Sequence, residues 1–279
     1  MIDILPQLDR LEQVLRNAGA LAVAVSGGVD SLTLATFAHR RLGAGVEMFH
    51  AVSPAVPAEA TGRVRALAQQ EGWSLSVIDA GEFADADYRS NPVNRCFYCK
   101  TNLYGAVTPR TKAQVVSGTN LDDLGEYRPG LSAAKNHGVR HPFVEAGIDK
   151  NTVRAIARHL GLDDVAELPS APCLSSRIET GIAIDPAMLG LVHAAEQRLT
   201  RMLVSSNLAP RTVRCRVRAK GVVIELDETR LAALDTAGRE NLKSEIGRLF
   251  SEGGFEYPVT LAPYRTGSAF LVRVQRDAA

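Results

Sequence analysis

Residues 26–31, with the sequence SGGVDS, combine the residue types that bind phosphate groups. The two glycines permit a tight turn and a close approach of phosphate oxygens to the backbone, and the serines add hydroxyl donors. An apolar run, residues 21–25, precedes the segment, and a helical pattern follows it. The N–H groups of a helix N-terminus would therefore face a phosphate. The segment lacks the lysine of the ATPase P-loop, and the alternative is a glycine turn with a simple helix cap.

Four cysteines are the other candidates for chemistry. Cys173 lies in a loop rich in proline and serine, and a cation at Arg177 would favour its thiolate; the alternative is a small buried hydrophobe. Cys96 and Cys99 share one helix face, which suits a shared metal, a redox pair or packing. Cys215 alternates with apolar residues on a predicted strand, so we expect it in the core.

A basic segment stands out in the C-terminal part. Residues 198–220 contain seven basic residues and no acidic one. Arg214, Arg216 and Arg218 alternate along one strand face, where guanidinium forks would bind an anionic substrate. The alternative is a solvated strand face. On the first interpretation, Arg216→Ala weakens substrate binding without unfolding the protein.

The elements that must position these residues follow two patterns. Strands are predicted at residues 21–25, 46–52, 74–78 and 114–117, alternating with helices at 2–18, 31–42, 57–70 and 96–107. This alternation predicts an α/β fold with an open parallel sheet in a domain spanning residues 1–180. After a loop at 169–181, a helix (186–203), two strands (212–218 and 222–226), a helix (229–250) and two further strands (257–261 and 270–274) predict a smaller α+β domain, residues 181–279.

Composition narrows the class of protein. The chain has 279 residues and a net charge of +1, with 46% hydrophobic and 23% charged residues. It is long enough to bury a core and is of ordinary globular composition, which excludes general disorder. The charge balance argues against a protein that coats nucleic acid. We find no signal-peptide pattern and no membrane-spanning run, and we therefore expect a cytoplasmic protein with reduced thiols.

Further motifs accompany SGGVDS in order along the chain: SP at 53–54, NRCFYCK at 94–100, SGTNLDDLGEYRPG at 117–130, APCLSSR at 171–177 and YRTGS at 264–268. Together they resemble the LarE family of ATP-dependent sulfur transferases, which belong to the adenine nucleotide alpha-hydrolase-like, or PP-loop, superfamily. The resemblance runs from about residue 21 to residue 268. It implies adenylylation of a carboxylate of pyridinium biscarboxylate mononucleotide, followed by sulfur transfer from a cysteine. The product would serve the nickel-pincer nucleotide cofactor of lactate racemase.

The resemblance also implies roles for individual residues. ATP would bind to Ser26, Gly27, Gly28, Asp30, Ser31 and Ser53, with Mg²⁺ at Asp30. Cys173 would donate sulfur and become dehydroalanine, and Glu126 and Glu196 would act as acid, base or metal groups. The substrate would bind to Arg177, Arg214, Arg216, Arg218 and Arg265. One departure is that residues 261–263 stand where the family has an aspartate and a glycine. Either Glu225 or Asp227 would substitute for that acid, or the substrate would differ.

Several alternatives stay open. Some family members hold an iron–sulfur cluster on three cysteines, here Cys96, Cys99 and Cys173, and deliver sulfur catalytically. Others in the superfamily thiolate tRNA, which needs a basic RNA-binding surface, or form amides, which does not require Cys173. A nucleotide-binding sensor without catalysis is the alternative from another class. We expect a homo-oligomer that works with other enzymes of the nickel-pincer pathway and binds neither nucleic acid nor membrane.

Overall fold

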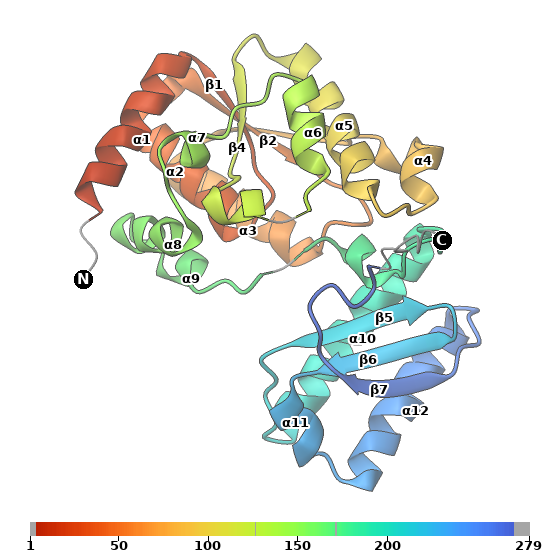
Figure 1. Ribbon diagram of the computed structural model, residues 1–279. Coiled ribbons are helices and arrows are strands. Elements are labelled where there is room, and N and C mark those ends of the chain that lie inside the picture. The colour runs from red at the N-terminus through yellow and green to blue at the C-terminus, as the bar shows by residue number, and fades with distance from the viewer. Residues whose placement is uncertain (1–3, 126, 171, 271–279) are drawn as a thin grey trace, which may run out of the picture. The chain divides into compact units, whose positions relative to one another are not determined.

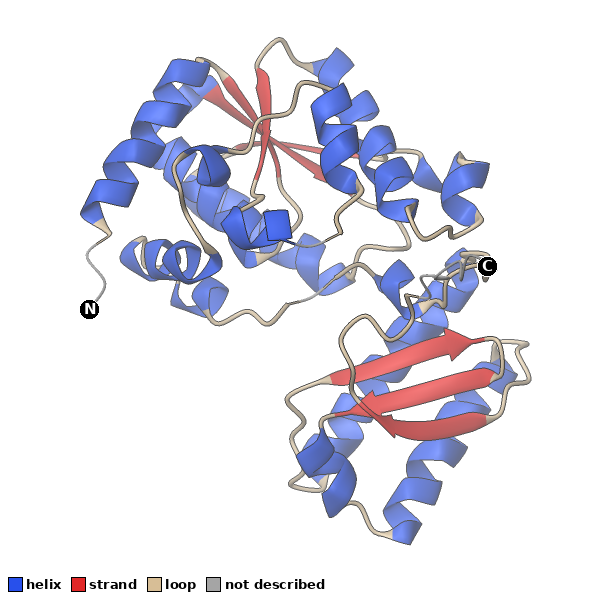
Figure 2. Cartoon of the chain, viewed as in Figure 1, coloured by secondary structure: helices blue, strands red, loops and turns tan. Residues whose placement is uncertain are grey.

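The computed structural model describes residues 4–125, 127–170 and 172–270, which form two compact units. The first unit contains the described residues up to Asp85 and those from Asn94 to Ser170. The second contains Ala86–Val93 and the described residues from Pro172 onward. Figures 1 and 2 show the helices and strands of both units.

A parallel sheet forms the centre of the first unit. Its strands are β1 (Leu21–Ala24), β2 (Val46–Ala51), β3 (Ser74–Ile78) and β4 (Gln114–Ser117), in the order β3-β2-β1-β4. All three strand pairs are parallel. Strand β1 is buried along its whole length, as its continuous apolar run requires. The predicted α/β fold with an open parallel sheet is confirmed.

Helices cover both faces of this sheet because β1 sends alternate side chains to opposite sides. Leu21 and Val23 pack with one layer, which contains α1 (Leu5–Ala18), α2 (Val29–Leu42), α3 (Ala58–Glu71) and α8 (Lys150–His159). Ala22 and Ala24 pack with the other, which contains α5 (Arg95–Val107) and α6 (Gly130–Asn136). The short helices α7 (Pro142–Glu145) and α9 (Asp163–Ala166) complete the unit. Sequence periodicity predicted none of the helices between β4 and residue 169.

The second unit is an α+β structure. It contains α4 (Ala86–Arg89), α10 (Pro186–Ser205), β5 (Val213–Arg218), β6 (Gly221–Leu226), α11 (Glu228–Ala233), α12 (Thr236–Glu252) and β7 (Val259–Pro263). Strand β6 lies between β5, to which it is antiparallel, and β7, to which it is parallel. Helix α10 packs against β5 and α12 against β7. Both predicted strands of the hairpin are confirmed.

Two expectations for the second unit differ from the structure. The single helix predicted over residues 229–250 is two helices, because Leu234 is extended and the Asp235 side chain accepts a hydrogen bond from the N–H of Gly238. That carboxylate caps a new helix. Most of the strand predicted at 270–274 falls on residues 271–274, which lie outside the described residues.

The chain enters the second unit before the expected boundary at residue 180. Ile178 forms a parallel bridge with Val217 of β5, and the N–H of Glu179 donates to the Val217 carbonyl at 2.9 Å. Residues 178–179 therefore lie along the edge of the three-stranded sheet, beside β5. A second difference is the excursion of residues 86–93 into this unit, for which the sequence shows no signal.

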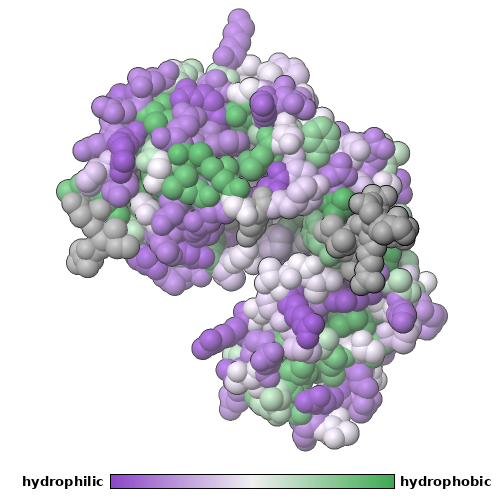
Figure 3. All heavy atoms as spheres, in the orientation of Figure 1, coloured by the Kyte–Doolittle hydropathy of each residue, from purple (hydrophilic) through white to green (hydrophobic). Residues whose placement is uncertain are grey.

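On the face that Figure 3 shows, hydrophilic residues surround apolar patches on both units. No helix within the described ranges is long and apolar enough to cross a membrane.

Asn91 joins the segment Ala86–Val93 to the rest of the second unit by hydrogen bonds. It is fully buried and has a left-handed φ of 54°. Its Nδ2 donates to the carbonyls of Glu179 and Ile182 at 2.9 and 3.0 Å and approaches that of Ile178 at 3.3 Å. Its own carbonyl accepts from the N–H of Gly181 at 2.9 Å. One side chain thus closes the loop that follows the Cys173 segment.

We predict that Asn91→Ala destabilises the protein by about 2–4 kcal/mol, because buried carbonyls lose their donor and alanine tolerates a left-handed φ less well. Asn207→Ala is the matched control, since Asn207 has a φ of 56° but an exposed side chain; its loss should be about 1 kcal/mol. Chemical denaturation measures both. Equal effects would show that the backbone conformation, and not the amide, is what matters at Asn91.

Candidate functional site

The predicted phosphate loop joins β1 to α2 in the first unit. Gly27 has a left-handed φ of 82°, and a Cβ atom on it would lie 2.6 Å from the carbonyl oxygen of Ala60. A larger residue would therefore displace the loop. Ser31 closes the loop from inside, because its Oγ accepts from the N–H of Ser26 and donates to the carbonyl of Gly28, both at 3.1 Å.

The N-terminus of α2 suits a phosphate. Among the described residues, no side chain caps this helix at Gly28. Its leading N–H groups are therefore left for a ligand, and the helix dipole favours an anion there. Ser26 is exposed beside them. These residues fit the phosphate chain of the expected ATP.

Asp30, the expected magnesium ligand, is held by two donors. Lys150 Nζ lies 2.5 Å from Asp30 Oδ2, and Asn120 Nδ2 lies 3.0 Å from Asp30 Oδ1. The Asp30 side chain is 26% exposed, so a cation in solution can reach it. Carboxylate oxygens suit Mg²⁺, which would compete with Lys150 for this group. The residues therefore fit a magnesium ion, and its presence stays a prediction.

The sequence pattern did not predict Lys150 or Asn120 as site residues. Asn120 belongs to the SGTN motif that follows β4, which was a usable signal. Lys150 is 120 residues from Asp30 along the chain and lies at the start of an ordinary amphipathic helix. Only the fold brings it to the loop.

The ends of β4 and β2 complete this edge of the sheet. A Cβ atom on Gly118 would lie 2.8 Å from the backbone of Asp30, so the chain after β4 packs directly on the loop. Ser117 Oγ lies 2.9 Å from Nδ1 of His141, whose pKa is lowered by burial. Ser53, after β2, accepts the N–H of Ala55 in a turn at 3.3 Å. Its predicted contact with ATP stays a prediction.

The Cys173 loop belongs to the second unit, where Arg177 braces it. Arg177 is 3% exposed, and its Nη1 donates to the carbonyls of Pro172 and Cys173 at 2.7 and 3.2 Å. Its Nε and Nη2 form a bidentate pair with Glu196, both at 3.0 Å. Glu196 also accepts the N–H of Cys215 at 3.0 Å. This geometry fits a positioning role for both residues; their predicted substrate and catalytic contacts stay predictions.

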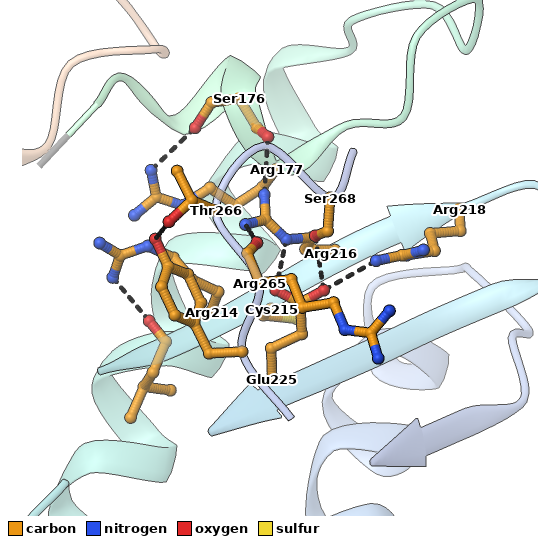
Figure 4. A network of polar contacts seen from close by, with 12 residues as sticks. Ser176, Arg177, Arg214, Cys215, Arg216, Arg218, Glu225, Arg265, Thr266 and Ser268 are labelled. Atoms are coloured by element: carbon orange, nitrogen blue, oxygen red, sulfur yellow. Dashed lines mark hydrogen bonds and ion pairs between the residues drawn. The ribbon is translucent and has the colours of Figure 1, made fainter. Parts of the chain in front are cut away.

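A buried carboxylate, Glu225, joins two arginines of β5 (Figure 4). It is 1% exposed and accepts from Arg216 Nε and Arg218 Nη2, both at 2.7 Å, and from Ser268 Oγ at 2.6 Å. Arg216 also donates to the carbonyl of Ser176 at 3.0 Å. The network therefore connects β5 and β6 to the Cys173 loop and to the YRTGS motif.

This network corrects two expectations. Arg216 is 5% exposed and paired, so it does not lie on a solvated strand face. Glu225 is occupied by arginines, and Asp227 caps α11 by accepting the N–H of Arg230. Both carboxylates therefore have partners within the protein, so neither is available to replace the aspartate that the resemblance leads us to expect at 261–263. Residues 261–263 form most of β7.

The other predicted substrate ligands differ in exposure. Arg214 is half-buried, and its guanidinium lies 5.9 Å from the centre of the Tyr264 ring. Burial, with Arg177 and Arg216 nearby, lowers the pKa of Arg214. Arg265 is exposed. Because burial is the main cause of this shift, the Arg214 cation is poorly solvated, and an anionic ligand beside it would stabilise it.

The cysteines are distributed over both units. Cys215 is fully buried and burial raises the pKa of its thiol, so the expected core position is confirmed. Cys96 and Cys99 are half-buried at the start of α5 in the first unit, whereas Cys173 is half-buried in the second. Within each unit, the described residues contain no group of three Cys, His, Asp or Glu side chains placed to hold a metal. A cluster on the three cysteines stays a prediction.

Glu126, the other predicted acid, base or metal group, lies outside the described residues.

Comparison with known proteins adds three relatives. An uncharacterized protein of Synechocystis sp. is 38% identical over 200 residues, 70% of this chain and 74% of that protein. The pyridinium-3,5-bisthiocarboxylic acid mononucleotide synthase of Lactiplantibacillus plantarum is 28% identical over 263 residues, 92% of this chain and 91% of the synthase. An uncharacterized protein of Methanocaldococcus jannaschii is 27% identical over 240 residues. No family model matches the chain.

We predict that Arg216→Ala destabilises the second unit by about 3–5 kcal/mol, because it leaves the buried Glu225 with a weaker set of partners. This reverses the expectation from sequence that the fold would be unaffected. Arg248→Ala is the control, since the Arg248–Glu245 pair is exposed and should contribute no more than about 1 kcal/mol. Urea denaturation followed by far-UV circular dichroism measures the free energy of unfolding of both variants. A loss at Arg216 no greater than the control would contradict the buried-pair assignment.

Proposed function

Because this chain belongs to the LarE-like family of PP-loop proteins, we propose that it is a sulfur transferase that makes a pyridinium thiocarboxylate. The observation that carries the proposal is the similarity to the L. plantarum synthase, which extends over 92% of this chain and 91% of the synthase. In finer terms, we propose an ATP-dependent enzyme that forms AMP and pyrophosphate. Its product would enter the nickel-pincer cofactor of lactate racemase.

The first unit would activate the substrate. Bound MgATP supplies an electrophilic α-phosphorus and a pyrophosphate leaving group. The N-terminus of α2 would hold phosphate oxygens with its backbone N–H groups, and Ser26 and Ser31 would keep the loop in shape. Asp30 would exchange Lys150 for the metal ion, and Lys150 would then be free to contact a phosphate. A substrate carboxylate that attacks the α-phosphorus becomes an acyl adenylate.

The second unit would supply the sulfur. A Cys173 thiolate attacks the activated carbonyl carbon, AMP leaves, and a thioester to the protein forms. A base then removes the Cα proton of Cys173, and the Cβ–S bond breaks with its electrons on sulfur. This releases a thiocarboxylate and leaves dehydroalanine. Arg177 supports this role, because its contacts with the Cys173 carbonyl and its neighbours fix the loop that carries the thiol.

The arginines of β5 support an anionic substrate. Arg216 and Arg218 share one carboxylate, so these three groups together carry a positive charge. Arg214 stands next to them on the same strand. A mononucleotide with a phosphate and two carboxylates matches this potential. The other proposed partners are enzymes of the same pathway.

Intact-mass measurement tests the sulfur donor. We predict that incubation with ATP, Mg²⁺ and pyridinium-3,5-biscarboxylic acid mononucleotide removes the mass of one hydrogen sulfide from the protein, mapped to Cys173. Cys173→Ala should abolish thiocarboxylate formation but retain pyrophosphate release, since activation precedes sulfur transfer. Cys99→Ala is the control for a cluster and should behave as wild type.

Three other results would contradict the sulfur-donor assignment or favour an alternative function. Full sulfur transfer by Cys173→Ala would refute the assignment of the donor. Repeated turnover with unchanged mass, an iron content in anaerobically purified protein and loss of activity in Cys99→Ala would favour the cluster form. Absence of both AMP and pyrophosphate with this substrate would favour a nucleotide sensor.

Asp30 offers a test of the magnesium site. We predict that Asp30→Asn raises the Mg²⁺ concentration needed for half-maximal pyrophosphate release by about tenfold or more, equivalent to about 1.4 kcal/mol, because the site loses its charge. Asp149→Asn is the matched control: Asp149 precedes Lys150 and caps α8, and asparagine caps a helix equally well. An unchanged magnesium dependence in Asp30→Asn would place the metal elsewhere.

A further inference from the structure

His50 is a buried histidine that the proposed chemistry does not use. It lies on β2 and is 1% exposed. Its Nδ1 is 2.8 Å from the carbonyl oxygen of Val25, and its Nε2 is 2.9 Å from Thr61 Oγ1 on α3. Both ring nitrogens therefore have partners, one on the residue before the phosphate loop and one on the helix beside it.

The contact with Val25 fixes the tautomer. A carbonyl oxygen can only accept, so Nδ1 must carry the hydrogen. In the neutral ring Nε2 is then an acceptor, and the Thr61 hydroxyl donates to it. Burial lowers the pKa of His50, which favours this neutral form. The direction of hydrogen-bond donation is therefore fixed: the Thr61 hydroxyl donates to Nε2 of His50, and Nδ1 of His50 donates to the carbonyl of Val25.

Val25 is the point where the backbone ladder between β1 and β2 ends. Its N–H still donates to the carbonyl of Phe49 on β2, at 2.8 Å. Its carbonyl instead accepts from the His50 ring. At the end of β1 the imidazole N–H therefore replaces the backbone N–H that would otherwise donate to this carbonyl.

The peptide unit between Val25 and Ser26 is held at both ends. In a trans peptide the C=O and N–H point in opposite directions. His50 binds the carbonyl of this unit, and Ser31 Oγ accepts its N–H at 3.1 Å. Fixing this plane fixes the direction in which the phosphate loop starts.

The same histidine connects the loop to α3. A Cβ atom on Gly27 would lie 2.6 Å from the carbonyl oxygen of Ala60, the residue before Thr61. Arg63 Nε donates to the Gly27 carbonyl at 3.2 Å. The phosphate loop therefore packs against the start of α3. Through its contact with Thr61, His50 fixes the start of α3 relative to the end of β1.

We propose that His50 is a positioning residue for nucleotide binding, which holds the Val25–Ser26 peptide so that the loop presents its N–H groups to the phosphates. The inference rests on the proposed function, because it assumes that this loop binds ATP. It requires a hydrogen-bond donor at the position of Nδ1. The acceptor at Nε2 is a secondary support.

Two substitutions separate the ring nitrogens. His50→Asn places an amide nitrogen close to the position of Nδ1, whereas His50→Gln carries its amide farther, toward the position of Nε2. His50→Leu removes both. The measurement is the dissociation constant of ATP by equilibrium dialysis, with the KM for ATP and for the mononucleotide and the thermal unfolding temperature of each variant.

We expect His50→Leu and His50→Gln to weaken ATP binding by about tenfold or more, equivalent to about 1.4 kcal/mol. His50→Asn should stay close to wild type, and the KM for the mononucleotide should not change in any variant. Thr61→Val should have a smaller effect than His50→Gln. Thr36→Val is its control, because Thr36 is a buried threonine of α2 whose hydroxyl donates to the Leu32 carbonyl of the same helix.

A purely structural role would lower the unfolding temperature without raising the ATP dissociation constant of folded variants, and that result would overturn the inference. Equal ATP affinity in His50→Asn and His50→Gln would also overturn it, and this comparison does not need a folded His50→Leu. ATP binding by the wild type without thiocarboxylate formation would overturn the proposed function alone. Absence of ATP binding by the wild type would overturn both.

Discussion

A buried charge needs a partner, and this requirement shapes the segment that carries Cys173. Two carboxylates meet it: Glu196 pairs with Arg177, and Glu225 pairs with Arg216 and Arg218. Each of these pairs includes a residue that is at most 5% exposed. An unpaired charge at such a position would be strongly unfavourable. Arg177 and Arg216 can therefore lie inside the second unit and bind backbone carbonyls of the loop.

The first unit solves a different problem, the control of backbone direction. Its loop contains little charge, and its shape depends on Gly27, on the Ser31 hydroxyl and on the close contacts with α3 and with the chain after β4. The one strong charge there, Asp30, faces Lys150 and remains partly exposed. A partly exposed pair of this kind is held weakly. It can exchange one cation for another, whereas the pairs of the second unit are suited to permanent support.

The sequence predicted those features that depend on local pattern. The buried strand Leu21–Ala24, the loop after it and the alternation of strands and helices follow from residue types that are close together in the chain, and so does the buried position of Cys215. The partners of charged groups could not be predicted in this way. Arg177 and Glu196 are 19 residues apart, and Lys150 and Asp30 are 120 apart. A solvated arginine strand and a buried, paired one have the same alternation, and only the position of Glu225 on the neighbouring strand distinguishes them.

The positions of Glu225 and Arg214 explain how one strand can serve both support and binding. Glu225 lies opposite Arg214 in the β5–β6 register, yet its oxygens bind Arg216 and Arg218 instead. Arg214 turns toward Tyr264, and it is this arginine whose pKa burial and its cationic neighbours depress. An added anion would stabilise a half-buried cation of this kind. Arg216 therefore supports the Cys173 loop through the Ser176 carbonyl, and we propose Arg214 as the arginine of β5 that would contact an anionic substrate.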